Sequence, residues 1–179
     1  MNRDLQEYLE VLGFDPRPFG AFATAPLPLQ QATTPSATAR AHARLMFVAS
    51  PEDEAPFAQK ADELLTKMIE AMGLRREDVC IVSLPANDTE LLQKEIEAVN
   101  PEVVVGLGAS MSHAMLRTEE PLNQLRGTFH TCPWIKRQDG SEISVMPTFP
   151  PSFLLRNPNM KKPAWEDLQQ VMTKLGLKK

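Results

Sequence analysis

The segment PEVVVGLGASMSHAMLR, residues 101–117, decides the fold of this chain. Its first part, Glu102–Leu107, is predicted to be a strand, because after Glu102 it continues as an apolar run of the kind that is buried on both faces of a sheet. The glycine-rich turn Gly106–Ser110 follows, and the spacing of apolar residues then predicts a helix over Met111–Arg117. A strand that passes through a tight turn into a helix is the repeating unit of an α/β protein.

The same alternation continues on both sides of this segment. It predicts three more strands and three long helices, namely strands at Leu45–Ala49, Val79–Leu84 and Ile143–Thr148 and helices at Pro56–Met72, Thr89–Val99 and Pro163–Leu175. The pattern therefore predicts a three-layer α/β/α sandwich around a central four-stranded parallel sheet. Ligands in such folds bind beyond the carboxyl ends of the strands. The candidate positions are Ala49–Phe57, Ser83–Asp88, Gly106–Ser110 and Phe149–Arg156.

Residues 1–42 differ in composition from this domain, which we place at residues 43–179. An acidic segment, Arg3–Leu12, has apolar residues at helical spacing, and an arm rich in proline and alanine follows it. A helix of barely three turns is not stable alone in water. It either packs on its own domain or binds a protein partner, and the sequence leaves both alternatives open.

Composition limits the classes of function. The chain of 179 residues has a formal net charge of −4, which argues against a protein that coats nucleic acid without specificity. Residues 101–179 are locally basic, with 10 Lys/Arg against 7 Asp/Glu. No apolar run approaches the roughly 20 residues that span a bilayer, so we expect a cytoplasmic protein without a membrane partner. The cysteines are Cys80 and Cys132, too few for a four-cysteine site, so we expect no metal and no cofactor.

Two strand ends carry candidate binding groups. The turn GLGAS, Gly106–Ser110, could hold an anion on backbone N–H groups, although it is neither a dinucleotide fingerprint nor a P-loop. In the C-terminal segment, the prolines before Phe153 predict a rigid turn, and residues 153–155 are read as an apolar loop followed by cations. An apolar wedge beside cations can unstack a base while gripping phosphates. The alternative is that these apolar side chains belong to the core.

Several motifs in order resemble the uracil-DNA glycosylase superfamily, and the iron–sulfur type called family 4 most. They are RLMFV (residues 44–48), GLRREDV (73–79), PEVVVGLG (101–108), LRGTFH (125–130), MPTFPPSFLLRNP (146–158) and WEDLQ (165–169). The resemblance covers about residues 43–176. It implies a four-stranded parallel sheet between helices, with a DNA groove at the carboxyl ends of the strands. Its members flip uracil out of DNA and cleave the bond between base and sugar.

The resemblance also implies which residues of this chain occupy the family's catalytic and uracil-binding positions. The carboxylate that positions water is replaced by Ser50, the asparagine that reads uracil by Ser83, and the histidine that donates to uracil by Pro150. The aromatic on which uracil stacks is retained as Phe57, so the base pocket would comprise Phe57 and Ser83. The four cysteines of the cluster are absent, so no iron–sulfur cluster is expected. The DNA contacts implied for the C-terminal loop are Pro151, Ser152, Leu154, Leu155, Arg156, Lys161 and Lys162.

Three hypotheses follow. The leading one is a catalytically degenerate member that binds DNA or another protein, with no confident catalytic residue. The second is an active, divergent glycosylase for uracil or another deaminated base, in which Glu52, Asp53 or Glu54 supplies the missing carboxylate. The third is an interaction subunit similar to the psi subunit of bacterial clamp loaders, which would meet its partner through the helix Arg3–Leu12. This third hypothesis rests on architecture alone.

Overall fold

The computed structural model describes residues 43–177. The predicted helix Arg3–Leu12 and the proline- and alanine-rich arm lie outside the described residues, as does the boundary proposed at residue 42. Within the described part, no helix combines the length and the apolar character needed to cross a bilayer.

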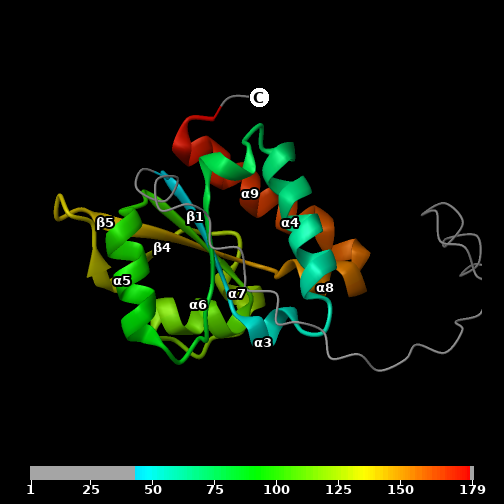
Figure 1. Cartoon of the computed structure of the whole chain (residues 1–179), viewed down its shortest axis with the longest axis horizontal. Coiled ribbons are helices and arrows are strands. Elements are labelled where there is room, and N and C mark those ends of the chain that lie inside the picture. The colour runs from blue at the N-terminus through cyan, green and yellow to red at the C-terminus, as the bar shows by residue number, and fades with distance from the viewer. Residues whose placement is uncertain (1–42, 178–179) are drawn as a thin grey trace, which may run out of the picture. The chain divides into compact units, whose positions relative to one another are not determined.

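One five-stranded sheet forms the centre of the domain (Figure 1). Its strand order is β2-β1-β3-β5-β4, in which the first four strands are parallel to one another and β4 runs antiparallel to β5. The strands are β1 (Leu45–Ala49), β2 (Cys80–Ser83), β3 (Val103–Leu107), β4 (His130–Lys136) and β5 (Glu142–Thr148). The four parallel strands are those that the apolar runs predict.

The prediction of four strands is wrong by one, because β4 lies at the edge of the sheet. An edge strand next to solvent is not a continuous apolar run: β4 alternates between exposed residues and the buried Cys132 and Ile135. It also contains Pro133, which cannot donate to a ladder and is tolerated at an edge. Its pairing with β5 is irregular between Thr131 and Lys136. A search for continuous apolar runs, which mark strands buried on both faces, therefore does not detect β4.

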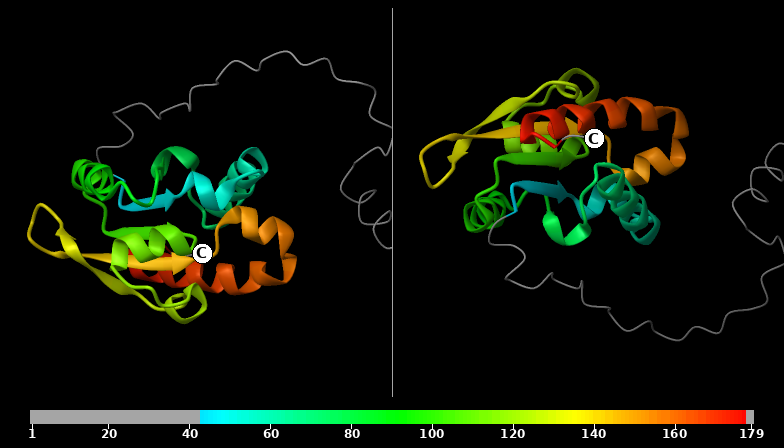
Figure 2. Two further views of the ribbon diagram at one scale, coloured as in Figure 1. Left: turned by 90° about the horizontal axis from the view of Figure 1, so that it is seen from below. Right: turned by 90° about the horizontal axis from the view of Figure 1, so that it is seen from above.

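Helices cover both faces of the sheet, so the predicted three layers are present (Figures 1 and 2). Helices α5 (Thr89–Val99) and α6 (Ala109–Leu116) pack on one face, and α4 (Ala58–Ala71) and α9 (Lys161–Leu175) on the other. Short helical segments complete the domain: α3 (Pro51–Glu54), α7 (Leu122–Leu125), α8 (Pro151–Arg156) and the 3₁₀ turns Arg76–Asp78 and Pro158–Met160.

Strand β1 shows why this sequence builds a sandwich. All five of its residues are buried, because successive side chains point to opposite faces and both faces are covered. Met46 and Val48 join the core beneath α5 and α6, whereas Leu45 and Phe47 join the core beneath α4 and α9. Burying each large apolar side chain contributes about 1.5–3 kcal/mol, so the two cores fix the sheet between the helical layers.

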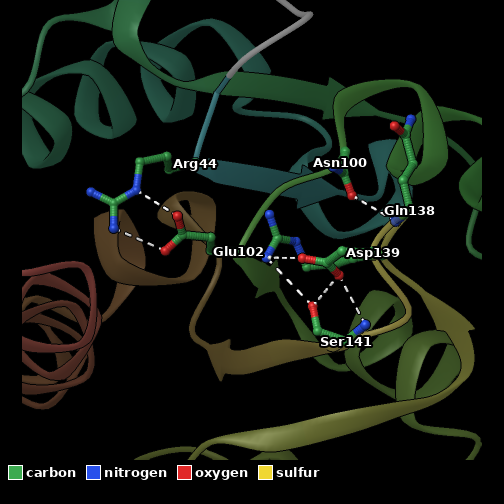
Figure 3. A network of polar contacts seen from close by, with 7 residues as sticks. Arg44, Asn100, Glu102, Gln138, Asp139 and Ser141 are labelled. Atoms are coloured by element: carbon green, nitrogen blue, oxygen red, sulfur yellow. Dashed lines mark hydrogen bonds and ion pairs between the residues drawn. The ribbon is translucent and has the colours of Figure 1, made fainter.

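Polar contacts hold the amino ends of β1 and β3, opposite the predicted binding edge (Figure 3). The guanidinium of Arg44 donates to Glu102 through Nε and Nη2, at 2.7 and 2.9 Å. The tip of the β4–β5 hairpin is tied to the end of α5, where the Gln138 N–H donates to Asn100 Oδ1 at 3.1 Å. These exposed contacts contribute at most about 1 kcal/mol each. The contact between Gln138 and Asn100 anchors the hairpin at this end of the sheet, and the cleft described below lies at the other end.

Candidate nucleic-acid interface

A cleft of about 440 Å³ lies beyond the carboxyl ends of the strands, which we call the strand-end cleft. It is bounded by α3, which follows β1, by the start of α6, which follows β3, and by α8, which follows β5. Helix α7 closes a further side. The residues that line it are Glu52, Asp53, Ala55, Ala109, Pro121, Leu122, Asn123, Phe149, Pro150, Phe153 and Arg156.

Asp53 of α3 lies against the first turn of α6. Its Oδ1 accepts a hydrogen bond from the Ser110 hydroxyl at 3.2 Å, and its Oδ2 is buried without a partner among the described residues. Partial burial raises the pKa of this carboxyl, and hydrogen bonding from Ser110 acts in the opposite direction. The turn Gly106–Ser110, which the sequence predicts to hold an anion, therefore has the carboxylate of Asp53 beside it. This placement is favourable because a helix N-terminus attracts negative charge.

Gly108 is the position that lets Asp53 approach. Its φ of +102° is one that other residues rarely adopt, and a Cβ built there would lie 2.3 Å from Asp53 Oδ2. We expect Gly108→Ala to lower the free energy of unfolding by about 1–3 kcal/mol through backbone strain, with a further loss as the carboxylate is displaced. Denaturant titration measures this change.

Gly140→Ala is the matched control, because Gly140 also has a positive φ of +82° but no atom within 4 Å of the added Cβ. The control carries the strain without the collision. Equal losses in the two variants would show that the approach of Asp53 to Gly108 does not restrict this position.

One wall of the cleft is aromatic, because Phe149 and Phe153 are among the residues that line it. The rings of Phe149 and Phe153 are stacked, with centroids 5.0 Å apart and planes at 21°. The Arg126 guanidinium lies 5.3 Å from the centre of the Phe149 ring. Phe149 is 7% exposed, whereas Phe153 is half-buried and lines the cleft.

A buried ion pair supports this wall from behind. Arg126 donates to Asp167 through Nε at 3.1 Å and through Nη2 at 2.8 Å. The hydroxyl of Thr148, the last residue of β5, donates to the same carboxylate at 2.7 Å. Burial raises the pKa of Asp167, while Thr148 and Arg126 oppose that rise. Because Phe149 follows Thr148 directly, the ion pair fixes the point at which the chain turns into α8.

The structure places the positions that the resemblance assigns to catalysis at or just after the carboxyl ends of three parallel strands, β1, β2 and β5. Ser50 is fully buried, and its hydroxyl has no hydrogen-bond partner within residues 43–177. Ser83 is exposed at the end of β2, in register with Ala49 of β1. Pro150 is buried at the N-cap of α8 and lines the cleft. Phe57, which is 39% exposed at the N-cap of α4, does not line it.

The prediction of a loop at residues 153–155 is wrong, because the segment is the helix α8. Pro151 occupies its first turn, where a missing N–H costs nothing. Leu154 is 1% exposed and packs in the core with α4, and Pro151 and Ser152 are buried as well. The Ser152 hydroxyl donates to the backbone oxygen of Asp53 at 2.5 Å. The buried Leu154 therefore matches the core alternative rather than the wedge.

The other predicted DNA contacts lie at the surface. Leu155 is half-buried, whereas Arg156, Lys161 and Lys162 are exposed at the end of α8 and the start of α9. Arg156 also lines the strand-end cleft. The cleft and this basic patch, Arg156, Lys161 and Lys162, therefore adjoin one another.

Sequence reasoning missed two features of the cleft. It did not place Asn123 there, and it did not pair Arg126 with Asp167. Arg126 and Asp167 belong to the motifs LRGTFH and WEDLQ, but a contact between residues 41 apart has no local spacing pattern. Within the described part of the chain, no group of three or more histidine, cysteine or acidic residues is arranged to hold a metal ion.

Comparison with known proteins identifies the family. A model of the Uracil DNA glycosylase superfamily matches residues 35–169. A Type-4 uracil-DNA glycosylase of Saccharolobus solfataricus is 30% identical over 162 residues, which are 76% of this chain and 73% of that protein. A Type-4 uracil-DNA glycosylase of Thermotoga maritima is 31% identical over 134 residues, 65% of this chain and 66% of its own length. The chain belongs to the uracil-DNA glycosylase superfamily, and its relatives include glycosylases of type 4.

Proposed function

We propose that this protein binds DNA at the strand-end cleft and the adjoining basic patch without cleaving the bond between base and sugar. The observation that carries the proposal is Pro150, which stands where the resemblance expects a histidine donor. It is buried at the N-cap of α8 and has no N–H to give. Removing one preorganised donor from an active site typically costs about 10² to 10³ in rate.

The other two assigned positions support the same conclusion. Ser50 replaces a carboxylate and is fully buried, so its hydroxyl cannot reach a water in the cleft. Ser83 replaces an asparagine and lies on an edge strand outside the cleft lining. Losses at catalytic positions are not additive, but three together leave little of the transition-state stabilisation that base excision needs.

DNA binding is supported by the cations and the aromatic rings at the cleft. Arg156 lines it, and Lys161 and Lys162 are exposed a few residues further along the chain, at the start of α9, where cations can neutralise phosphates. Phe149 and Phe153 line the cleft, and aromatic rings can stack with bases of any sequence.

Fluorescence anisotropy with labelled single- and double-stranded oligonucleotides at about 50 mM salt tests this proposal. We expect binding that weakens steeply as salt is added, because each neutralised phosphate releases a counterion. Undetectable affinity for both forms at this salt would overturn it.

A second candidate function, a divergent active glycosylase, is favoured by one observation. Glu52 is exposed and lines the cleft, so it could supply the carboxylate that positions water beside a base in the cleft. Asp53 is less suited, since its Oδ2 is covered and its Oδ1 is held by Ser110. Release of free base from uracil-, hypoxanthine- or xanthine-containing oligonucleotides, lost in Glu52→Gln, would favour this function.

A further inference from the structure

The aromatic surface of the strand-end cleft is Phe153 and not Phe57. Phe153 is half-buried, stacks on Phe149 at 5.0 Å and lines the cleft. Phe57 lies outside the cleft lining, at the start of α4. A base that entered the cleft would therefore find its stacking partner on α8, next to the cation of Arg156.

The exposed polar side chains that line the cleft are Glu52, Asn123 and Arg156. Arg156 donates hydrogen bonds, and the Asn123 amide both donates and accepts them. Glu52 accepts hydrogen bonds but donates none when ionised. The buried Oδ2 of Asp53 is out of reach, which leaves Glu52 as the reachable carboxylate of the pair. Carboxylates read bases by accepting from the amino group of cytosine. The single ring N–H on the pairing edge of uracil lies between two carbonyl oxygens, which repel a carboxylate.

We propose that the strand-end cleft binds one unpaired base that carries an exocyclic amino group. The base stacks on Phe153, its amino group donates to Glu52, and a neighbouring phosphate contacts Arg156. The cleft volume of about 440 Å³ falls within the range of about 300–1,000 Å³ that is usual for small-ligand sites. This inference rests on the proposed function, and it replaces uracil with an amino-bearing base as the preferred occupant.

Oligo(dC) and oligo(dU) of equal length are matched probes, because their bases differ only in the amino or carbonyl group at C4 and in the proton on N3. Anisotropy titrations of the full chain are expected to show a preference for oligo(dC) of about tenfold. Glu52→Gln should abolish the preference without weakening binding overall, since glutamine both donates and accepts and removes a negative charge near phosphates. Glu63→Gln, on the exposed face of α4, is the control that should retain it.

A second pair of variants tests the stacking surface. Phe153→Leu is expected to weaken binding of both oligonucleotides by about tenfold, because base–aromatic stacking contributes about 1–3 kcal/mol per base. Thermal denaturation shows whether this variant is folded, and Phe153→Tyr, which keeps the ring, should restore affinity. If Phe57→Leu weakens binding and Phe153→Leu does not, the base lies at the family position and the inference is wrong.

The outcomes separate this inference from the proposed function. Equal binding of oligo(dC) and oligo(dU), unchanged by Glu52→Gln, would overturn the inference and leave DNA binding intact. A preference for oligo(dU) would also overturn it, in favour of a uracil site. Failure of the wild-type chain to bind either oligonucleotide at about 50 mM salt would overturn both.

Discussion

Asp167→Ala is expected to lower the free energy of unfolding by about 3–5 kcal/mol. Asp167 is fully buried and accepts three hydrogen bonds, two from Arg126 and one from Thr148. Removal of the carboxylate would leave the Arg126 guanidinium, which is 20% exposed, without its counter-ion. The variant would leave the charge of Arg126 uncompensated and the hydroxyl of Thr148 unpaired. Each of these costs more free energy than the hydrogen bond that is lost. Chemical denaturation measures the effect.

Glu166→Ala is the control, because Glu166 precedes Asp167 on α9 but is exposed. The double variant Arg126→Ala/Asp167→Ala should be less destabilised than the two single changes added together, because the charge that would be stranded is gone. If Asp167→Ala and Glu166→Ala melt at the same temperature, the ion pair does not support the wall of the cleft.

Replacing Arg156, Lys161 and Lys162 together by alanine is expected to weaken DNA binding by about 100-fold at low salt. The slope of log affinity against log salt should fall by about 3, because each lost phosphate contact removes a slope of about 0.9. The loss should be similar for different sequences, since phosphate contacts carry no base information. Anisotropy titrations over a range of salt concentrations measure both quantities.

A second triple variant controls for net charge. Arg75, Lys94 and Lys136 are exposed on other parts of the domain, at a 3₁₀ turn, on α5 and on β4. Replacing them by alanine removes three positive charges, as in the first triple variant, but at positions that do not line the cleft. An equal fall in slope for the two triple variants would mean that DNA does not dock at the basic patch of Arg156, Lys161 and Lys162.

The elements with strong periodic patterns could be predicted from the sequence. The helix Thr89–Val99 and the strand Leu45–Ala49 have the predicted bounds, because their apolar spacing is dictated by burial on a helix face or within a sheet. The prolines before Phe153 predict a loop at residues 153–155, which lie in the helix α8. Pro151 occupies the first helical position, where proline equally marks a helix start, and the packing of Leu154 against α4 decides between the two interpretations.

The candidate site was less predictable, for physical reasons. Asp53 and Ser110 are 57 residues apart, and Arg126 and Asp167 are 41 apart, so no local pattern announces either contact. The glycines of the turn Gly106–Ser110 predict that it can hold an anion, but they do not predict that Asp53 of the same chain lies there. Which aromatic residue faces the cleft depends on how α8 and α4 pack, and Phe153 rather than Phe57 is the result.

If this member of the superfamily binds DNA without excising a base, binding and base release can be separated in one experiment. The most direct measurement incubates the chain with uracil-containing single- and double-stranded oligonucleotides and scores both retained DNA and released uracil in the same samples, with Phe57→Ala alongside. We expect retained DNA and no released uracil. Uracil release by the wild-type chain that Phe57→Ala abolishes would contradict this expectation and would assign the chain the activity named for its type-4 relatives.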